Sequence, residues 1–278
     1  MYRVLETEIV APDVTRLRVL APRVATHWRP GQFVIVRPLR DNERIPLTVA
    51  DADPDTGAIT LVVQAVGRTT HLLCDLPVGG HVADITGPLG QPTDAKHVGT
   101  VVAVAGGVGS AIIYPRAKAL RAVDNTVLGI LGGRTAALVT LERELAEVCD
   151  ELFVTTDDGS AGRKGLVTEV LTDLLAERRV DLVFAAGPVP MMAAVAEVTR
   201  PLEIPTECSL NPIMVDGTGM RGGCRVDVGG KTRFACVDGP EFDAHAVDFE
   251  RLAQRNRAYL DFERRRAELE PCRAVPAP

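Results

Sequence analysis

One segment near the middle of the chain constrains the fold more than any other, because an uncharged apolar run leads directly into a cluster of glycines. Residues 100–105 read Thr-Val-Val-Ala-Val-Ala, as expected for a strand buried on both faces. Gly-Gly-Val-Gly follows at 106–109, and a helical pattern continues to about Arg121. This order places free backbone N–H groups where a diphosphate can bind. A plain tight turn would also need glycine, but the flanking strand and helix favour a nucleotide site.

Strands alternate with helices beyond this segment. The pattern predicts strands at 126–131, 152–155 and 181–185, and helices at 138–148, 165–176 and 189–199. This rhythm is typical of βαβ units and therefore predicts a doubly wound parallel sheet. From residue 209 the alternation ends in a Gly- and Asp-rich loop over 211–243.

A charged helix over 248–269 follows that loop, and a disordered tail is expected over 271–278. The helix carries a narrow apolar face made of Phe249, Leu252, Ala253, Asn256 and Leu260.

The first 97 or so residues contain short segments rich in Val, Ile and Thr instead. Strands are predicted at 2–11, 14–21, 32–37 and 58–66, and one short helix at 70–76. Turn residues such as Pro12-Asp13 separate these segments. Because no long helix is available to connect parallel strands, we expect this half to be an antiparallel barrel.

Composition excludes several classes of protein. With 278 residues, 46% hydrophobic and 24% charged, the chain fits a soluble protein of two domains. A net charge of −6 and only 4% aromatic residues argue against nucleic-acid binding. No apolar run approaches the ~20 residues that span a bilayer, and the N-terminus lacks the apolar core of a signal peptide. We therefore expect a cytoplasmic protein with no membrane span.

Two acidic residues follow the strand predicted at 152–155. Asp157 and Asp158 lie at the carboxyl end of the expected sheet, where an acid can bind ribose hydroxyls and repel a 2′-phosphate. An Asx-type turn would explain one of them. Arg134, after the strand predicted at 126–131, could instead hold a 2′-phosphate or be a plain surface residue. The acids favour NAD over NADP.

Six motifs in a fixed order resemble those of the ferredoxin–NADP reductase superfamily. They are RPGQF (29–33), RIPLT (44–48), GPLG (87–90), AGGVG (105–109), TTDDGS (155–160) and GPVPMM (187–192). The run SLNPIMVDGTGM (209–220), followed by CRV, FACVDGPEFDAH and DFERL, more specifically resembles the small subunits of NADH-dependent reduced ferredoxin:NADP oxidoreductase, also called sulfide dehydrogenase. Electron-transfer subunits of dihydroorotate dehydrogenase are more distantly similar. The resemblance covers about residues 1–260.

This resemblance implies an FAD-binding barrel over 1–97, an NAD(H)-binding α/β domain over 98–208, a 2Fe-2S-type loop over 209–246 and a helix over 247–270. The residues implied to contact FAD are Arg44, Pro46, Leu47, Thr48, Gly67, Arg68 and Thr69. Those implied to surround NAD(H) are Gly107, Val108, Gly109, Asp157, Asp158, Gly187 and Met191. Ser110-Ala111-Ile112 replaces the more usual Ile-Ala-Pro, so the start of this helix is expected to differ.

The cluster loop departs from the family pattern D-G-T-G-M-C-x-x-C. Asp216, Cys224 and Cys236 match implied ligands, but Arg221 stands where a thiolate is expected. Iron–sulfur sites normally take four protein ligands, and a guanidinium stays protonated and carries no lone pair for iron. Cys208 is far upstream. The sequence thus leaves open whether a 2Fe-2S cluster is present, and zinc would also lack a ligand.

The implied function is that of an FAD-dependent electron-transfer subunit. It would pass hydride or electrons between NAD(H) and a larger flavoprotein subunit or ferredoxin, with no general acid or base required. Two alternatives stay open: a standalone NAD(P)H:flavin or ferredoxin reductase with a degenerate cluster site, and a non-catalytic FAD-binding scaffold.

Overall fold

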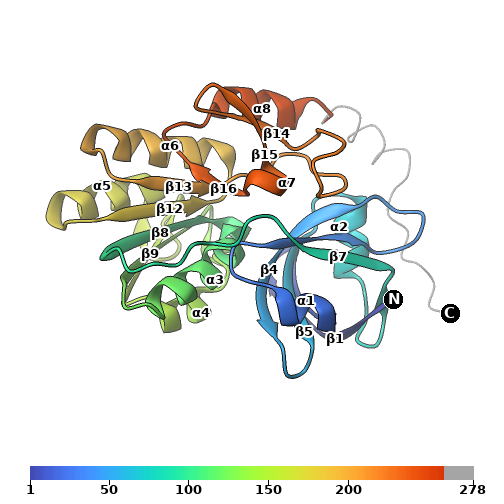
Figure 1. Ribbon diagram of the computed structural model, residues 1–278. Helices are drawn as coiled ribbons and strands as arrows, with labels where there is room; N and C mark the ends of the chain where they lie inside the picture. Colours follow the sequence, from blue (N-terminus) through green and yellow to red (C-terminus); the bar gives the residue numbers. More distant parts are fainter. Residues whose placement is uncertain (260–278) are drawn as a thin grey trace.

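Two lobes lie side by side in the computed structural model, which describes residues 1–259 (Figure 1). The N-terminal lobe is a nearly closed antiparallel barrel with the strand order β6-β1-β2-β5-β4-β3-β7. Its strands are β1 (Tyr2–Ala11), β2 (Val14–Leu20), β3 (Phe33–Arg37), β4 (Ile45–Asp53), β5 (Ala58–Gln64), β6 (His81–Val82) and β7 (Asp84–Leu89). Its helices are α1 (Pro22–His27) and α2 (Arg68–Cys74).

Alternation along the strands builds the barrel core. On β2, Leu17 and Val19 point inward and are fully buried, whereas the alternating residues Arg16 and Arg18 face outward. Leu17 lies opposite Leu61 of β5 in the strand register, so a cross-strand pair of leucines fills the interior. The predicted antiparallel barrel is confirmed.

The second lobe is a seven-stranded sheet with the order β11-β10-β9-β8-β12-β13-β16. Its strands are β8 (Thr100–Gly106), β9 (Thr126–Gly133), β10 (Glu151–Thr156), β11 (Arg163–Lys164), β12 (Leu182–Ala186), β13 (Thr206–Ser209) and β16 (Glu241–Asp243). All pairs are parallel except β13 with β16. The predicted doubly wound sheet is confirmed, with one antiparallel strand at its edge.

Helices cover both faces of this sheet. They are α3 (Ser110–Arg121), α4 (Glu142–Val148), α5 (Val167–Glu177) and α6 (Val189–Thr199), with short 3-10 turns η1 (Gly107–Gly109), η2 (Ala136–Leu138) and η3 (Arg200–Leu202). Buried residues of α3 and α4 pack on one face, and those of α5 and α6 on the other. The central strand β8 is buried between these layers, with residues 101–105 fully inaccessible.

Some predicted bounds were wrong for local reasons. The helix expected over 138–148 begins only at Glu142, because Leu141 adopts a left-handed conformation with φ 57°. The helix expected over 70–76 begins two residues earlier, at Arg68. The strand β13 was missed, since its four residues carry no long apolar run.

The loop predicted over 211–243 is more structured than expected. It contains the hairpin β14 (Arg225–Val228) and β15 (Lys231–Phe234), the short helix α7 (Ala235–Asp238) and the edge strand β16. The hairpin turns at Gly229 and Gly230, with φ of 58° and 71°. Two residues at positive φ are what a two-residue type I′ turn requires, so a Gly-Gly pair was the sequence signal for this hairpin.

The C-terminal helix α8 (Phe249–Arg257) packs on α6, above the sheet in Figure 1. Asp248 caps its N-terminus by accepting a hydrogen bond from the Arg251 backbone N–H at 2.9 Å. Leu252 is buried and Phe249 packs on the sheet core, so these two residues of the apolar face are covered within this chain. The rest of the helix predicted to residue 269 and the tail predicted over 271–278 lie outside the described residues.

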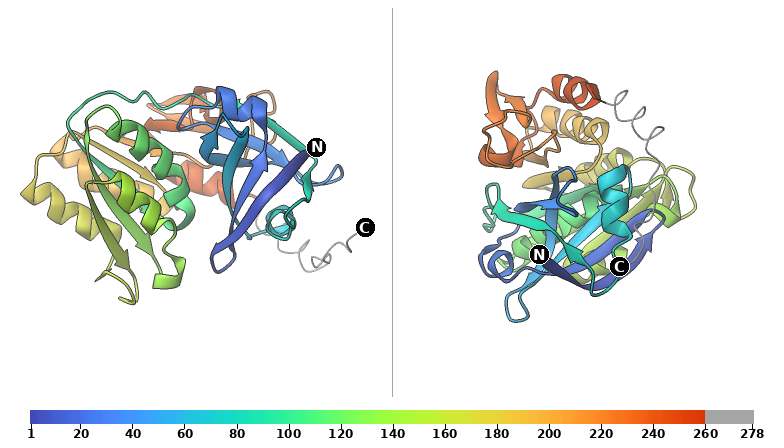
Figure 2. Two further views of the ribbon diagram at one scale, coloured as in Figure 1. Left: turned by 90° about the horizontal axis from the view of Figure 1, so that it is seen from below. Right: turned by 90° about the vertical axis from the view of Figure 1, so that its right-hand side faces the viewer.

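An extended segment over 90–99 connects the lobes (Figure 2). A buried cation fixes the second lobe to this connection and to the C-terminal part. Arg116 of α3 is only 4% exposed, forms ion pairs with Glu207 and Glu241, and lies over the Phe184 ring at 4.4 Å. Thr93 of the connecting segment donates a hydrogen bond to Glu241 at 3.0 Å.

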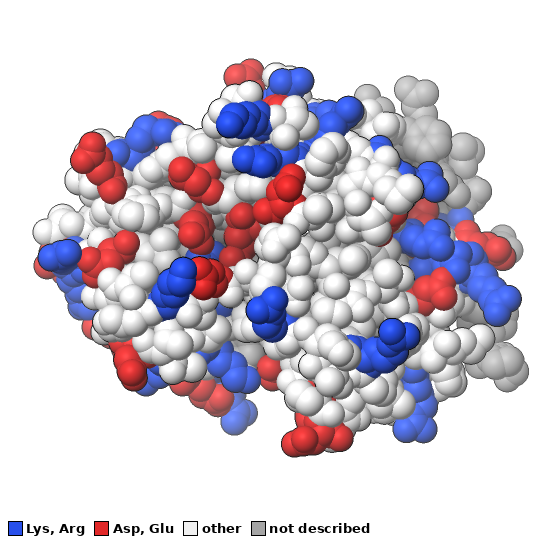
Figure 3. Space-filling view, in the orientation of Figure 1, with Lys and Arg blue, Asp and Glu red and all other residues white. Residues whose placement is uncertain are grey.

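Acidic side chains gather in the region of β13 and β16 on the face drawn in Figure 3. Glu241 is among the residues that surround Arg116, and burial raises the pKa of its carboxyl above the usual range, against the pull of Arg116.

In the described residues, no helix is both long and apolar enough to cross a bilayer.

Candidate functional site: a nucleotide cavity at the junction of the lobes

A cavity of about 570 Å³ opens at the carboxyl ends of β8, β9, β10 and β12. From β8 the chain continues to β9 on one side of the sheet, and from β12, the neighbour of β8 on the other side, it continues to β13. The cavity therefore lies at the switch point of the doubly wound sheet. Ligands bind at such switch points in open α/β folds. Val14 and Gln64 of the barrel also line it. A cavity of this size suits a nucleotide-sized ligand.

The glycine loop after β8 forms one wall of the cavity. Gly107 has φ 54°, and a Cβ added there would have no atom within 4 Å, so its position faces open space. Gly109 is required for a different reason, which is close packing: a Cβ added there would lie 2.1 Å from the Ala186 carbonyl oxygen. Glycine therefore permits both access for a ligand and close packing of α3 on β12.

Two hydroxyls that sequence analysis missed hold this loop in place. Thr140 donates a hydrogen bond from Oγ1 to the Gly107 carbonyl at 3.1 Å. Its Oγ1 also lies 2.6 Å from Oγ of Ser110, which is fully buried. Ser110, where the sequence departs from the family pattern, thus supplies a partner for Thr140, and α3 begins at this residue.

Most residues that were implied to surround NAD(H) line this one cavity. They are Gly107, Val108, Gly109, Asp157, Gly187 and Met191. Ser209, the last residue of β13, and Asn211, two residues further on, also line the cavity, and neither was a predicted site residue.

The two neighbouring aspartates separate in the structure. Asp157 lines the cavity, as does Arg134. Asp158 does not line it, because its Oδ1 accepts hydrogen bonds from the Ser160 backbone N–H at 2.9 Å and from Ser160 Oγ at 2.6 Å. The Ser160 hydrogen bonds lower the pKa of Asp158. The Asx-turn interpretation therefore accounts for Asp158, and only Asp157 is placed to meet a ligand.

The residues implied to bind FAD lie on two segments of the barrel. Arg44 is exposed just before β4, and Pro46, Leu47 and Thr48 are half-buried on that strand. The segment starting at Gly67 caps α2 and follows the cavity-lining Gln64 by three residues.

A Cβ on Gly67 would meet no atom within 4 Å, whereas Thr69 is buried and Arg68 is exposed. An open glycine at a helix start and a nearby cation fit a diphosphate chemically.

The C-terminal loop brings two of the three implied metal ligands together. Cys224 and Cys236 are buried, with their Sγ atoms 2.9 Å apart. Cys236 lies in the short helix α7. Burial and the adjacent Cys224 raise the pKa of Cys236 to about 12.

The third implied ligand, Asp216, is near enough for its charge to add to the raised pKa of Cys236, after burial and Cys224, but it does not form a three-residue metal site with the two cysteines. Asp216 is half-buried and its Oδ1 accepts a hydrogen bond from the Thr218 backbone N–H at 3.2 Å, and Arg221 is exposed. Within residues 1–259, no group of three or more His, Cys, Asp or Glu side chains is arranged to hold a metal ion. Cys208 is buried on β13. The donor set therefore does not fit a 2Fe-2S cluster held by four ligands.

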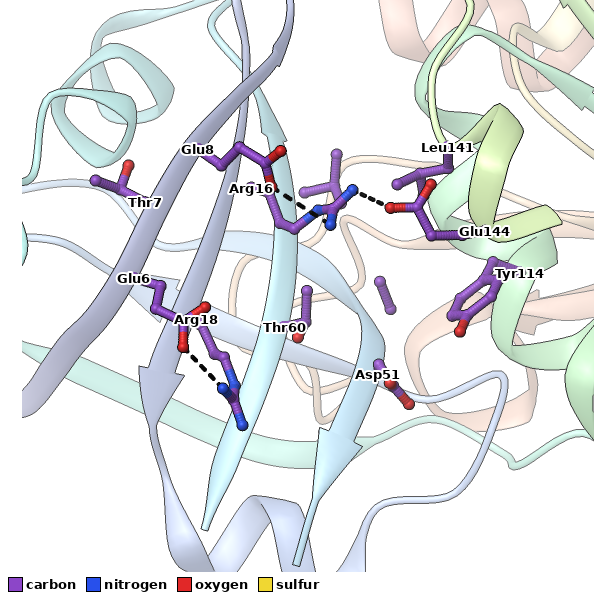
Figure 4. Close-up of a pocket in the computed structure, with 12 residues that line it drawn as sticks. Glu6, Thr7, Glu8, Arg16, Arg18, Asp51, Thr60, Tyr114, Leu141 and Glu144 are labelled. Carbon is purple, nitrogen blue, oxygen red and sulfur yellow. Dashed lines mark hydrogen bonds and ion pairs between the residues drawn. The ribbon is translucent and has the colours of Figure 1, made fainter. Parts of the chain in front are cut away.

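A smaller hollow lies between β2 of the barrel and the helices α3 and α4 (Figure 4). Its charged side chains pair with one another: Arg16 contacts Glu144 and Glu8, and Arg18 contacts Glu6. Because these charges satisfy each other, we interpret the hollow as a polar junction between the lobes and not as a ligand site.

An antiparallel barrel followed by a doubly wound sheet with a cavity at their junction defines the ferredoxin reductase-like FAD/NAD-binding fold. The cytochrome P450 reductase GcoB of Amycolatopsis shares it, with a TM-score of 0.62 at 24% identity over 73% of this chain and 66% of that one. Much closer is the NADH-dependent reduced ferredoxin-NADP oxidoreductase, studied for flavin-based electron bifurcation. Its structure has a TM-score of 0.91 at 43% identity, covering 97% of this chain and 98% of that one.

Curated relatives agree with this structural likeness. The dihydroorotate dehydrogenase B (NAD(+)) electron transfer subunit homolog of Thermotoga maritima is 46% identical over 92% of this chain and 90% of its own length. The electron transfer subunit of Bacillus caldolyticus is 34% identical over 88% and 96%. Residues 211–248 match the family model of the iron-sulfur cluster binding domain of dihydroorotate dehydrogenase B. The chain belongs to the family of dihydroorotate dehydrogenase B electron transfer subunits and is an oxidoreductase subunit.

Proposed function

We propose that this chain takes reducing equivalents from NADH at the cavity between its lobes and delivers them, through FAD, to a partner flavoprotein subunit. The observation that carries this proposal is the cavity itself, whose walls come from the glycine loop of the sheet and from Val14 and Gln64 of the barrel. A nicotinamide held there would lie against the barrel, which would hold the flavin in this proposal. FAD, when bound, supplies the exchange between hydride and single electrons.

In this proposal, the residues of this chain bind NAD(H) and orient it for the reaction. The open face at Gly107 supports a role in admitting the diphosphate of NAD(H), with Val108, Gly109, Gly187 and Met191 completing the wall. Asp157 would accept hydrogen bonds from the adenosine ribose and oppose a 2′-phosphate. Asp158 would support this site only indirectly, through the turn it makes with Ser160.

FAD would be held by the barrel. Arg44 would neutralise its diphosphate together with Gly67, Arg68 and Thr69 at the start of α2, and Pro46, Leu47 and Thr48 of β4 would line the ring. No side chain is assigned to acid–base chemistry, because hydride transfer between nicotinamide and flavin needs only alignment and exclusion of water.

The finer features of the assembly are also proposals. The electron transfer subunits among the relatives support a larger flavoprotein partner, and a ferredoxin would be a second partner. We propose a cytoplasmic location, and domains at 1–97, 98–208, 209–246 and 247–270.

The experiment is flavin retention and reduction in the purified chain. Arg44→Ala should weaken FAD retention about tenfold, because losing a charge-assisted hydrogen bond costs about 1.5–3 kcal/mol. Arg40→Ala removes an exposed cation from the same loop and is the matched control. NADH should bleach the flavin absorbance of the wild-type protein. A chain that retains FAD equally well after Arg44→Ala contradicts the assignment of Arg44, and a flavin that NADH does not bleach contradicts the function.

A further inference from the structure

The hairpin β14–β15 determines the position of the two buried thiols. Its register pairs Arg225 with Phe234, and the Ala235 backbone N–H donates to the Cys224 carbonyl at 3.0 Å. Cys224 precedes the first strand and Cys236 follows the second, so both come to the same end of the hairpin. Backbone pairing therefore accounts for the close approach of the Sγ atoms, which lie 2.9 Å apart.

The loop that precedes Cys224 is fixed to the barrel. Gly217 has φ 72°, and a Cβ there would lie 2.5 Å from Leu89 Cδ1 and 2.9 Å from Ile35 Cγ1. Arg221 and Met220 on the same loop are exposed. Position 221 is thus turned to solvent, while the Cys224 and Cys236 residues are only 3% and 2% exposed.

We propose that Cys224 and Cys236 form a dithiol that closes reversibly into a disulfide, and that this cross-link holds the loop where relatives carry a cluster domain. A disulfide requires the sulfur atoms to approach to about 2.05 Å, which is less than 1 Å closer than the 2.9 Å observed. With a peroxide as oxidant, two S–H bonds break and one S–S bond forms. The two electrons and two protons reduce one peroxide to two waters, and a small dithiol reverses the reaction.

The test begins with the full chain purified anaerobically. We expect far less than one iron, sulfide or zinc per chain. After one equivalent of hydrogen peroxide, two thiols should disappear together, the intact mass should fall by two hydrogen atoms, and digestion should yield a peptide joining residues 224 and 236. Dithiothreitol should restore both thiols. The melting temperature should rise by several degrees on oxidation, because the bond constrains the unfolded chain.

Cys224→Ser and Cys236→Ser should abolish the paired loss, whereas Cys149→Ser and Cys208→Ser remove other buried thiols and should leave it unchanged. Peptide mapping of the wild-type protein provides the answer if a serine variant fails to fold. Two irons with two sulfides per chain, a stoichiometric zinc ion, or peroxide oxidation that adds oxygen without a cross-link would each overturn the proposal. Bleaching of the flavin by NADH is independent of all these outcomes, so the proposed function is tested separately.

Discussion

At the residue scale, the positions of Asp157 and Asp158 relative to the cavity predict different roles for these two adjacent acids. Asp157 faces the proposed ribose site, and Asp158 makes the turn with Ser160. Asp157→Asn should therefore lower the preference for NADH over NADPH, measured as the ratio of kcat/KM values with a dye acceptor. The expected change is only several-fold, because the cavity is open and salt screens its charges.

Asp158→Asn is the matched control for this effect. It should reduce stability slightly through the weakened turn, with the cofactor ratio unchanged. If Asp158→Asn shifts the ratio and Asp157→Asn does not, the assignment made from the cavity is wrong. If the wild-type protein prefers NADPH, Arg134 and not Asp157 would determine the cofactor specificity.

Burial of the Cys149 thiol predicts how the stability of the protein changes at high pH. Burial beside Asp150 raises the pKa of Cys149 from 9.0 to about 11. Between these values the unfolded chain ionises first, so the stability that the thiol contributes is complete below pH 9 and is lost as the pH rises to 11.

The loss would amount to about 2 kcal/mol in the free energy of unfolding. Chemical denaturation of wild type and Cys149→Ala at pH 8 and pH 10.5 measures it. The wild-type protein should lose more stability than the variant over this interval, and parallel pH profiles would disprove the effect.

At the scale of elements, the segments with a clear apolar pattern could be predicted, whereas β13 could not. The strand at 100–105 and its glycine loop were found because burial on both faces leaves an uninterrupted apolar run. β13 was missed because four residues between turns carry too little pattern. Leu141 was placed inside a helix because nothing in its side chain signals a positive φ.

The candidate site was predictable to a similar degree. Residues on the glycine loop and after β12 were found from their motifs. Thr140 and Ser110 were missed, because their hydrogen bond joins positions thirty residues apart, and local sequence contains no information about such a pair. Asp157 and Asp158 could be separated only by the turn geometry.

The loop over 211–243 yields the next prediction. If Arg221 is what excludes a cluster, Arg221→Cys should supply the missing thiolate at the family spacing. Anaerobic reconstitution with iron and sulfide should then give about two irons per chain, as a 2Fe-2S site requires. Arg225→Cys, on the adjoining strand, is the matched control and should gain none. Equal iron in wild type and Arg221→Cys would show that Arg221 is not the obstacle.

At the scale of the whole molecule, electron transfer depends on how the lobes are aligned. Two ion pairs join the barrel to the helices of the sheet: Arg16 with Glu144, and Asp51 with Lys118 at 3.3 Å. Figure 4 shows Arg16 reaching from β2 toward α4. None of these four side chains lines the nucleotide cavity, so we expect the pairs to affect the reaction through the arrangement of the lobes.

Removing the first pair should therefore change turnover without changing ligand binding. Arg16→Ala should lower kcat for NADH-dependent dye reduction several-fold, with FAD content and the KM for NADH nearly unchanged. The global stability should change by less than about 1 kcal/mol, since the pair is partly exposed. Arg18→Ala is the matched control, because Arg18 lies on the same strand but its partners Glu6, Asp53 and Thr56 all belong to the barrel. Restoration of kcat in the double variant Arg16→Glu/Glu144→Arg would tie the effect to this pair. Equal kcat in the Arg16 and Arg18 variants would mean that the junction does not control the alignment.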